Sequence, residues 1–340
     1  MTPAIFGCSG TTLTADERDF FREADPAGYI LFARNCEDPA QLRALTDDFR
    51  GLHGRKRLLI SIDQEGGRVA RLRPPHWSPY PAGAAFDRLY RLAPASAIEA
   101  ARANAEAMAL ELAAMGLNVT YHPPLDLRQP GAHDVIGDRA LGADPMQVAA
   151  IGRALLDGLE RGGVTGCIKH MPGHGRSHVD THKELPTVDA SADELKSDIA
   201  PFRALNSAKI GMTGHLVFPV WDVDNPATLS EPIIRDIIRG EIGFKGLLLT
   251  DDIDMEALSG TIPQRCARAI AAGCDIALNC WAKLGDMRAI CEALPAMSEA
   301  ATQRLDAALE GTTLADAIPQ RQSELLAKRD TLLALVEEVA

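Results

Sequence analysis

Eight short apolar runs recur along the chain, and each is followed by a polar or glycine-containing stretch and then by a segment with helical periodicity. The runs are continuously apolar rather than alternating, which is typical of strands in a parallel sheet that is covered on both faces. We predict strands at residues 4–7, 28–32, 57–62, 117–121, 165–168, 209–213, 246–250 and 275–279. Eight such units in succession favour an α/β fold with a (β/α)8 barrel of the TIM type over an open, doubly wound sheet.

The segments between these runs carry helix-start signals, such as Asp38-Pro39 and Asp144-Pro145. We predict helices at residues 40–52, 97–115, 145–161, 192–205, 231–240 and 263–272. Two further stretches with Leu and Ala at helical spacing lie near the end of the chain. No linker or repeat divides the sequence, so we expect one domain, in which residues 1–295 form the barrel and residues 296–340 add C-terminal helices packed on it.

Charge and cysteine content restrict the partners and the compartment. The net charge of -12 repels polyanions and no Lys/Arg-rich block occurs in the sequence, so nucleic acid is not expected as a partner. No run of about 20 apolar residues predicts a membrane span, and the first residues lack the features of a signal peptide. Seven scattered cysteines without a CxxC pair suit reduced thiols in the cytoplasm.

Polar motifs follow six of the predicted strands at the point where each strand ends. In a (β/α)8 barrel this edge carries the active site. Strand ends are exposed and naturally polar, so one such motif alone would indicate little. Six in register favour a functional site. They are Asp63-Gln64-Glu65-Gly66-Gly67-Arg68, Asp126, Lys169-His170, Thr213-Gly214-His215, Asp251-Asp252 and Asn279.

The segment KHMPGHGRSHVDTH, residues 169–182, has a histidine at every fourth position from the second residue on, which is the spacing of a metal site on one face of a helix. Pro172, Gly173 and Gly175 would interrupt any such helix. We therefore predict a loop that can move over a site and exclude water from it. Zinc binding by this loop stays open as an alternative.

Two short motifs carry carboxylates that suit catalysis. In Asp180-Thr181-His182 the carboxylate could orient the imidazole for proton transfer near neutral pH, although a solvated loop histidine is the simpler interpretation of this motif alone. Adjacent strand residues point to opposite sides, so we expect only one of Asp251 and Asp252 to face the barrel mouth. A carboxylate fixed there suits covalent attack on an anomeric carbon, while its structural alternative is a helix cap.

Taken together, the motifs resemble those of family 3 glycoside hydrolases. They are ILFARN (30–35), IDQEGGRV (62–69), VIGDRALG (135–142), KHMPGHG (169–175), DTH (180–182), MTGHLVFP (212–219), PATLS (226–230) and GFKGLLLTDDIDM (243–255). The resemblance extends from about residue 4 to residue 280. It is closest to the single-domain bacterial β-N-acetylglucosaminidases of cell-wall recycling, because KH-x-PGHG followed by D-x-H separates them from the β-glucosidase-like members. Met171 and the spacer at 176–179 depart from the usual pattern of the family.

This resemblance implies a role for particular residues. Asp251 would be the nucleophile, and His182, held by Asp180, would be the general acid and base. Contacts to the sugar would fall to Asp63, Arg71, Arg139, Lys169 and His170. Neither a cofactor nor a resident metal is implied.

The activity implied is that of a retaining exo-β-N-acetylglucosaminidase, which cleaves GlcNAc-β-1,4-anhydroMurNAc with or without its peptide through a glycosyl-aspartate intermediate. We expect a cytoplasmic monomer whose partner is this small-molecule substrate. Three alternatives remain: a β-glycosidase of other sugar specificity, a sugar-binding barrel without activity, and a metal-dependent hydrolase that uses His170, His215 and Asp251.

Overall fold

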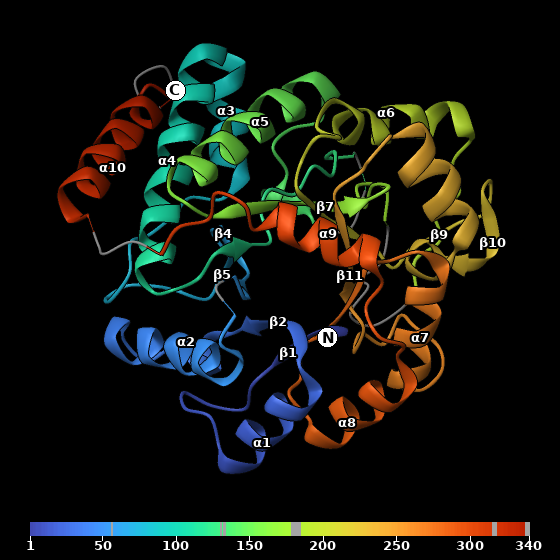
Figure 1. The fold of residues 1–340 in the computed structure, drawn as a ribbon. Helices are drawn as coiled ribbons and strands as arrows, with labels where there is room; N and C mark the ends of the chain where they lie inside the picture. Colours follow the sequence, from blue (N-terminus) through green and yellow to red (C-terminus); the bar gives the residue numbers. More distant parts are fainter. Residues whose placement is uncertain (56, 130, 132–133, 178–184, 315–317, 337–340) are drawn as a thin grey trace.

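The computed structural model describes residues 1–340 except 56, 130, 132–133, 178–184, 315–317 and 337–340. Eight parallel strands close into a barrel (Figure 1). In their order around the barrel they are β1 (Thr2–Gly7), β12 (Ile276–Asn279), β11 (Leu247–Asp252), β8 (Ile210–Thr213), β7 (Thr165–Met171), β6 (Val119–Thr120), β3 (Leu59–Ile62) and β2 (Pro26–Leu31). All eight predicted strands are confirmed, and with them the (β/α)8 barrel.

The first strand closes the barrel because it pairs with a neighbour on each side. Ile5 of β1 lies opposite Gly28 of β2 and opposite Leu278 of β12. All strand pairs of the barrel are parallel, so their carboxyl ends meet at one rim. The polar motifs that follow the strands in the sequence therefore gather at this rim.

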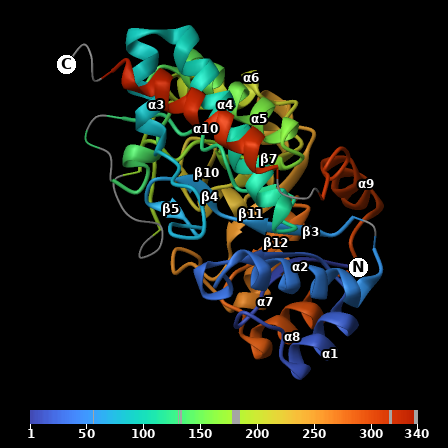
Figure 2. The ribbon, with the colours of Figure 1, turned by 90° about the vertical axis from the view of Figure 1, so that its left-hand side faces the viewer.

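Helices surround the barrel, with α1, α2, α7 and α8 on one side of it and α3 to α6 with α10 on the other (Figure 2). They are α1 (Ala15–Ala24), α2 (Pro39–His53), α3 (Gly83–Leu92), α4 (Pro94–Ala114), α5 (Pro145–Arg161), α6 (Ala192–Ala204), α7 (Ile262–Ala272), α8 (Leu284–Ala293), α9 (Glu299–Ala308) and α10 (Pro319–Ala334). The predicted helix at 231–240 is a π-helix, η4 (Ile233–Glu241), which buries four isoleucines. Helices α1, α3 and α8 were not predicted.

Short elements in the loops shape the rim. Hairpins form from β4 (Gln64–Gly66) with β5 (Val69–Ala70) and from β9 (Val217–Phe218) with β10 (Asp222–Pro226). Single 3-10 turns occur at η1 (Ala33–Asn35), η2 (Gly137–Arg139) and η3 (Ala227–Leu229). Both hairpins and all three turns lie in loops that follow the carboxyl ends of strands, where they add side chains to the rim.

The barrel interior forms an apolar cluster of its own, to which every strand contributes. Leu305, Ala308 and Leu309, from α9 and its end, belong to the same cluster. The hydroxyl of Thr165, the first residue of β7, donates a hydrogen bond to the carbonyl of Ala308 at 2.7 Å. Helix α9 therefore covers the end of the barrel opposite the rim, where it lies across the strands in Figure 1.

Helix α10 packs along α4 on the outside of the barrel. Arg329 of α10 is buried and donates to the carbonyl of Pro79 and to the amide oxygen of Asn104. All seven cysteines are free thiols, and five of them are buried, as expected for reduced core residues. Among the described residues, no helix combines the length and the apolar character that crossing a lipid bilayer requires.

Candidate active site

A cavity opens among the carboxyl ends of the barrel strands and encloses ≈ 730 Å³ of empty space, part of it open solvent. Six of the eight residues selected from the sequence line it: Asp63, Arg71, Arg139, Lys169, His170 and Asp251. Asp180 and His182 lie outside the described residues. The other lining residues are Phe32, Val69, Tyr121, Val135, His174, Met212, Asp252, Met255, Leu278 and Cys280.

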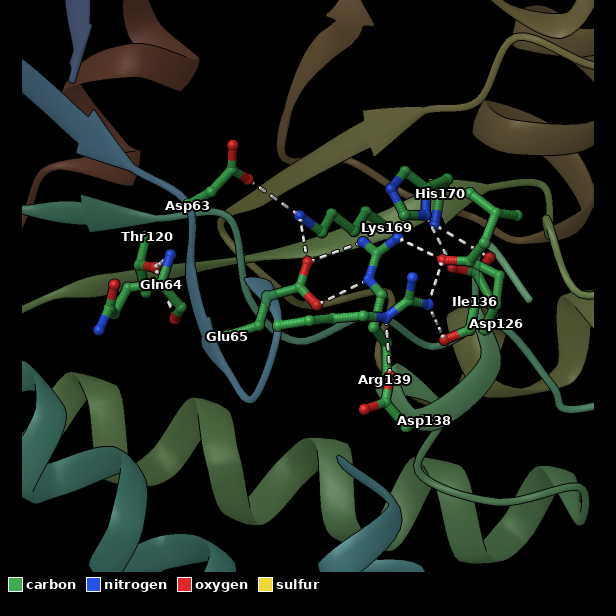
Figure 3. Close-up of polar contacts among 12 residues, drawn as sticks. Asp63, Gln64, Glu65, Thr120, Asp126, Ile136, Asp138, Arg139, Lys169 and His170 are labelled. Atoms are coloured by element: carbon green, nitrogen blue, oxygen red, sulfur yellow. Dashed lines mark hydrogen bonds and ion pairs between the residues drawn. The ribbon is translucent and has the colours of Figure 1, made fainter. Parts of the chain in front are cut away.

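Asp63, Lys169 and Arg139 line the cavity and are linked through Glu65 in a chain of alternating charges (Figure 3). The ammonium group of Lys169 lies 3.2 Å from a carboxylate oxygen of Asp63 and 2.7 Å from one of Glu65. Glu65 in turn accepts two hydrogen bonds from the guanidinium of Arg139, at 2.9 and 2.8 Å. Arg71 pairs with the second oxygen of Asp63 at 3.1 Å. Each cation is thus held in place by a carboxylate while it borders the cavity.

The centre of this chain is buried, and its members stay charged because they compensate one another. Burial alone would raise the pKa of Glu65, but the charges of Arg139 and Lys169 hold this pKa well below its usual value. For Lys169 burial favours the neutral form, yet Glu65 and Asp63 raise its pKa. Lys169 is therefore a cation with three donors, and Asp63 an acceptor, at a site suited to ring hydroxyls.

The IDQEGGRV motif folds into the β4–β5 hairpin, and this hairpin presents Glu65 to its partners. The side-chain oxygen of Gln64 accepts from the amides of Arg71 and Leu72 at 2.9 and 3.1 Å, which closes the hairpin. Gly66 has φ +110°, and a Cβ there would lie 2.3 Å from the carbonyl oxygen of Pro81. Only glycine fits that position without a shift of the backbone.

Arg139 is presented by the loop that precedes it, and Arg68 holds this loop. The Arg68 guanidinium donates to the carbonyls of Asp134, Val135 and Ile136. It also pairs with Asp138 at 2.8 Å. A side chain from the β4–β5 hairpin therefore fixes the segment that delivers Arg139 to Glu65 (Figure 3).

A buried carboxylate orients two histidines at the end of β7. Asp126 accepts from Nδ1 of His170 at 2.7 Å, from the His170 amide at 3.2 Å and from the His174 amide at 2.7 Å. Burial alone would raise the pKa of Asp126, but the charge of His170 and these hydrogen bonds lower it to about 2. Burial and the nearby His170 lower the pKa of His174 to about 4, which keeps that ring neutral.

Asp251 lies near the end of β11 on the cavity wall. Its carboxylate accepts the amide of Asp252 at 2.8 Å. Burial alone would raise the pKa of Asp251, but His170, His215 and this hydrogen bond lower it. A carboxylate that stays ionised at a fixed strand end can attack an electrophilic carbon with little rearrangement.

The expectation that only one residue of the Asp251-Asp252 pair would face the barrel mouth is wrong, because both line the cavity. The regular alternation fails here because the pairing of β11 with β12 shifts between Leu249 and Asp252. Burial and the nearby Asp254 raise the pKa of Asp252 to about 8. The two adjacent carboxyl groups therefore differ, because the pKa of Asp251 is lowered and that of Asp252 is raised.

Asp254 is a structural anchor for the loop after β12. Its carboxylate accepts the side-chain amide of Asn279 at 2.9 Å and the backbone amides of Cys280 and Trp281 at 2.9 and 3.1 Å. This set of donors fixes the position of Cys280 on the cavity wall.

The alternative metal site would need a free lone pair on His215. Nε2 of this ring lies 2.9 Å from the carbonyl oxygen of Asp252, which can only accept, so Nε2 carries the proton. Nδ1 faces the hydroxyl of Thr228 at 2.8 Å. Burial lowers the pKa of His215, which keeps this neutral tautomer. Within the described ranges, no three His, Cys, Asp or Glu side chains form a group that could hold a metal ion.

Sequence reasoning missed the role of Glu65, although it quoted the motif that contains it. The available signal was charge balance: three cations, Arg71, Arg139 and Lys169, were assigned to the sugar site against a single carboxylate, Asp63. Buried cations need paired anions, and Glu65 supplies the second one.

Comparison with known proteins gives the family. The glycosyl hydrolase family 3 N-terminal domain matches residues 9–312. A β-hexosaminidase of Bordetella avium (strain 197N) is 39% identical over 283 residues, which cover 82% of this chain and 80% of that protein. A β-hexosaminidase of Aromatoleum aromaticum is 38% identical over 284 residues, which cover 82% of this chain and 79% of that protein. The crystal structure of NagZ from Neisseria gonorrhoeae in complex with N-trifluoroacetyl-D-glucosamine is 31% identical, with a TM-score of 0.89 and 98% of each chain covered. The chain therefore belongs to glycosyl hydrolase family 3, as a β-hexosaminidase of this family.

Proposed function

We propose that this enzyme is a retaining exo-β-N-acetylglucosaminidase that hydrolyses GlcNAc-β-1,4-anhydroMurNAc, with or without the attached peptide. The observation that carries the proposal is the position of Asp251, a carboxylate with a lowered pKa at a strand end, in the same cavity as Asp63, Lys169 and Arg139 of the ion-pair chain. The ion-paired side chains offer charged partners for the sugar hydroxyls, and Asp251 offers a nucleophile for the anomeric carbon.

Asp63 and Lys169 are the central sugar contacts in this proposal. Asp63 accepts hydrogen bonds from ring hydroxyls, and Lys169 donates to them, while Arg71 and Arg139 border the same cavity. His170, oriented by Asp126, completes this set. The match to a NagZ that binds N-trifluoroacetyl-D-glucosamine supports an N-acylated glucosamine as the sugar.

The reaction takes place in two inversions at the anomeric carbon. In the first, an Asp251 oxygen bonds to this carbon while protonated His182 donates its proton to the glycosidic oxygen, so the leaving sugar departs as an alcohol. In the second, neutral His182 removes a proton from water, which attacks the same carbon and frees Asp251. Asp180 orients the imidazole throughout.

A histidine as acid and base suits the charges around Asp251. A second carboxylate beside it would raise the pKa of the nucleophile by repulsion, whereas neutral imidazole would not. The raised pKa of Asp252, caused by burial and by Asp254, favours its neutral form and so limits this repulsion. The substrate class and the free cysteines agree with a role in recycling cell-wall fragments in the cytoplasm.

Two variants and one trapping reagent test this mechanism. We expect Asp251→Ala and His182→Ala to lower kcat/KM for an aryl N-acetyl-β-glucosaminide by about 10³-fold or more while the protein stays folded. Asp47→Ala on α2, an exposed carboxylate paired with Arg43, is the matched control. A fluorinated substrate analogue should add the mass of one sugar to Asp251. Activity of wild-type level in either variant, or a label on another residue, would refute the assignment.

A further inference from the structure

Trp281 is a large aromatic side chain at the rim of the site that the sugar contacts leave unused. It directly follows Cys280, which lines the cavity, and 53% of its surface is exposed. An indole combines a large apolar face with one N–H donor, which suits contact with the apolar face of a sugar.

The backbone fixes the position of this tryptophan. The carboxylate of Asp254 accepts the Trp281 amide at 3.1 Å, and this carboxylate is itself held by Asn279. The next residue, Ala282, has φ +57°, in the left-handed region that residues with a side chain rarely adopt. Such backbone conformations concentrate at functional sites, where surrounding contacts maintain them.

One cation lies against the Trp281 ring, and a second contacts the carbonyl of the preceding residue. The ammonium group of Lys283 lies 4.5 Å from the centre of the indole ring. Arg34 donates to the carbonyl of Cys280 at 2.5 Å and lies 4.8 Å from the ring centre of Phe32, a residue of the cavity wall. Both cations are exposed, in a protein whose net charge is -12. This section of the rim therefore combines an aromatic surface with positive charge.

We propose that Trp281 and Lys283 form the subsite for the leaving group and select one that carries a carboxylate. The indole contacts the apolar face of the leaving sugar, and Lys283 pairs with a carboxylate of its lactyl or peptide substituent, with Arg34 adding positive potential. This inference rests on the proposed function, because it assigns the other half of the substrate that the cavity cleaves.

The test compares two disaccharides that share the same non-reducing N-acetylglucosamine: GlcNAc-anhydroMurNAc, whose leaving sugar is anionic, and chitobiose, whose leaving sugar is neutral. For Lys283→Gln we expect kcat/KM to fall about fivefold on the anionic substrate and to stay unchanged on chitobiose, and high salt should remove the difference. Lys283→Arg, which keeps the positive charge, should retain the wild-type kcat/KM on the anionic substrate.

For Trp281→Ala we expect kcat/KM to fall about tenfold on both disaccharides, with Trp281→Phe retaining most of the activity. Inhibition by free N-acetylglucosamine, which occupies the inner cavity, should not change in any variant. Lys245→Gln, an exposed lysine at the opposite end of the barrel, is the matched control.

The outcomes separate this inference from the proposed function. A wild-type enzyme that cleaves neither disaccharide nor an aryl N-acetyl-β-glucosaminide would refute the function itself. The leaving-group subsite alone would be refuted if the wild type is active but kcat/KM of Lys283→Gln falls equally on both disaccharides. It would also be refuted if Trp281→Ala leaves kcat/KM unchanged.

Discussion

The buried ion-pair chain makes Glu65→Gln the most informative single change in this enzyme. Glu65 is 5% exposed and is the common partner of Lys169 and Arg139. A glutamine has nearly the same shape but no charge, so the variant tests the charge rather than the packing. Lys169 keeps Asp63 at 3.2 Å, whereas Arg139 loses the carboxylate that accepts both of its hydrogen bonds.

The expected loss of stability follows from this geometry. Removing one partner of a buried ion pair costs about 3–5 kcal/mol, and the remaining Lys169–Asp63 pair places this case at the lower end, about 3 kcal/mol. A protein of 340 residues has an unfolding entropy of about 0.7 kcal/mol/K, so Tm should fall by about 4 °C. Because Lys169 and Arg139 also border the cavity, kcat/KM should fall about 10²-fold.

Thermal unfolding of Glu65→Gln beside Glu99→Gln is the decisive measurement. Glu99 also pairs with one Arg and one Lys, but it lies on the surface, so that variant should lose less than about 1 kcal/mol. The pKa of Glu65 is lowered on folding, so its contribution is complete above its ordinary value of 4.5 and disappears as pH falls further. Equal Tm values for both variants at pH 7, or a stability gap that widens on acidification, would refute the reasoning.

Three further changes test other parts of the site. Asp126→Asn replaces the acceptor of His170 Nδ1 and of two amides, and should cost about 2–3 kcal/mol in a urea titration at pH 7 but progressively less as pH falls towards the Asp126 pKa of about 2. Gly66→Ala places a Cβ 2.3 Å from the Pro81 carbonyl at φ +110° and should lower the free energy of unfolding, measured by urea titration, by about 2 kcal/mol; an unchanged free energy would contradict the strain argument. Exhaustive treatment with a chelator should leave kcat/KM unchanged, because both ring nitrogens of His215 are engaged by protein atoms; lost activity restored by zinc would support the metal alternative.

The order of the strands could be predicted from the sequence because buried parallel strands are nearly uniform in polarity. Runs such as residues 246–250 are largely apolar, so each strand can be recognised from its local sequence alone. Helix α3 begins without a side-chain cap, whereas α1 has a start signal from which it could have been predicted, the capping box of Thr14 and Glu17. The helical pattern of residues 231–240 does not distinguish the π-helical form of η4 from an α-helix.

Within the site, the residues at strand ends were predictable, but their relationships were not. Position after a strand predicted that Asp63, Lys169 and Asp251 would share a rim, and the structure brings them to one cavity. The bridging role of Glu65 comes from a hairpin that turns back over the barrel, a contact between residues 65 and 139 that no local pattern encodes. The shift in β11 that turns Asp252 towards the cavity likewise follows from pairing with β12.

The way the barrel closes affects how the protein is made. β1 pairs with β12, so Ala4 lacks its partner Ala277 until the residues between them have been synthesised. At translation speeds of roughly 5–20 residues per second, that interval is roughly 15–55 s. Throughout it one edge of the first strand has no partner, and the barrel interior also lacks Leu305 and Leu309. Until residue 277 has been added, the open edge of β1 is therefore available for non-native strand pairing.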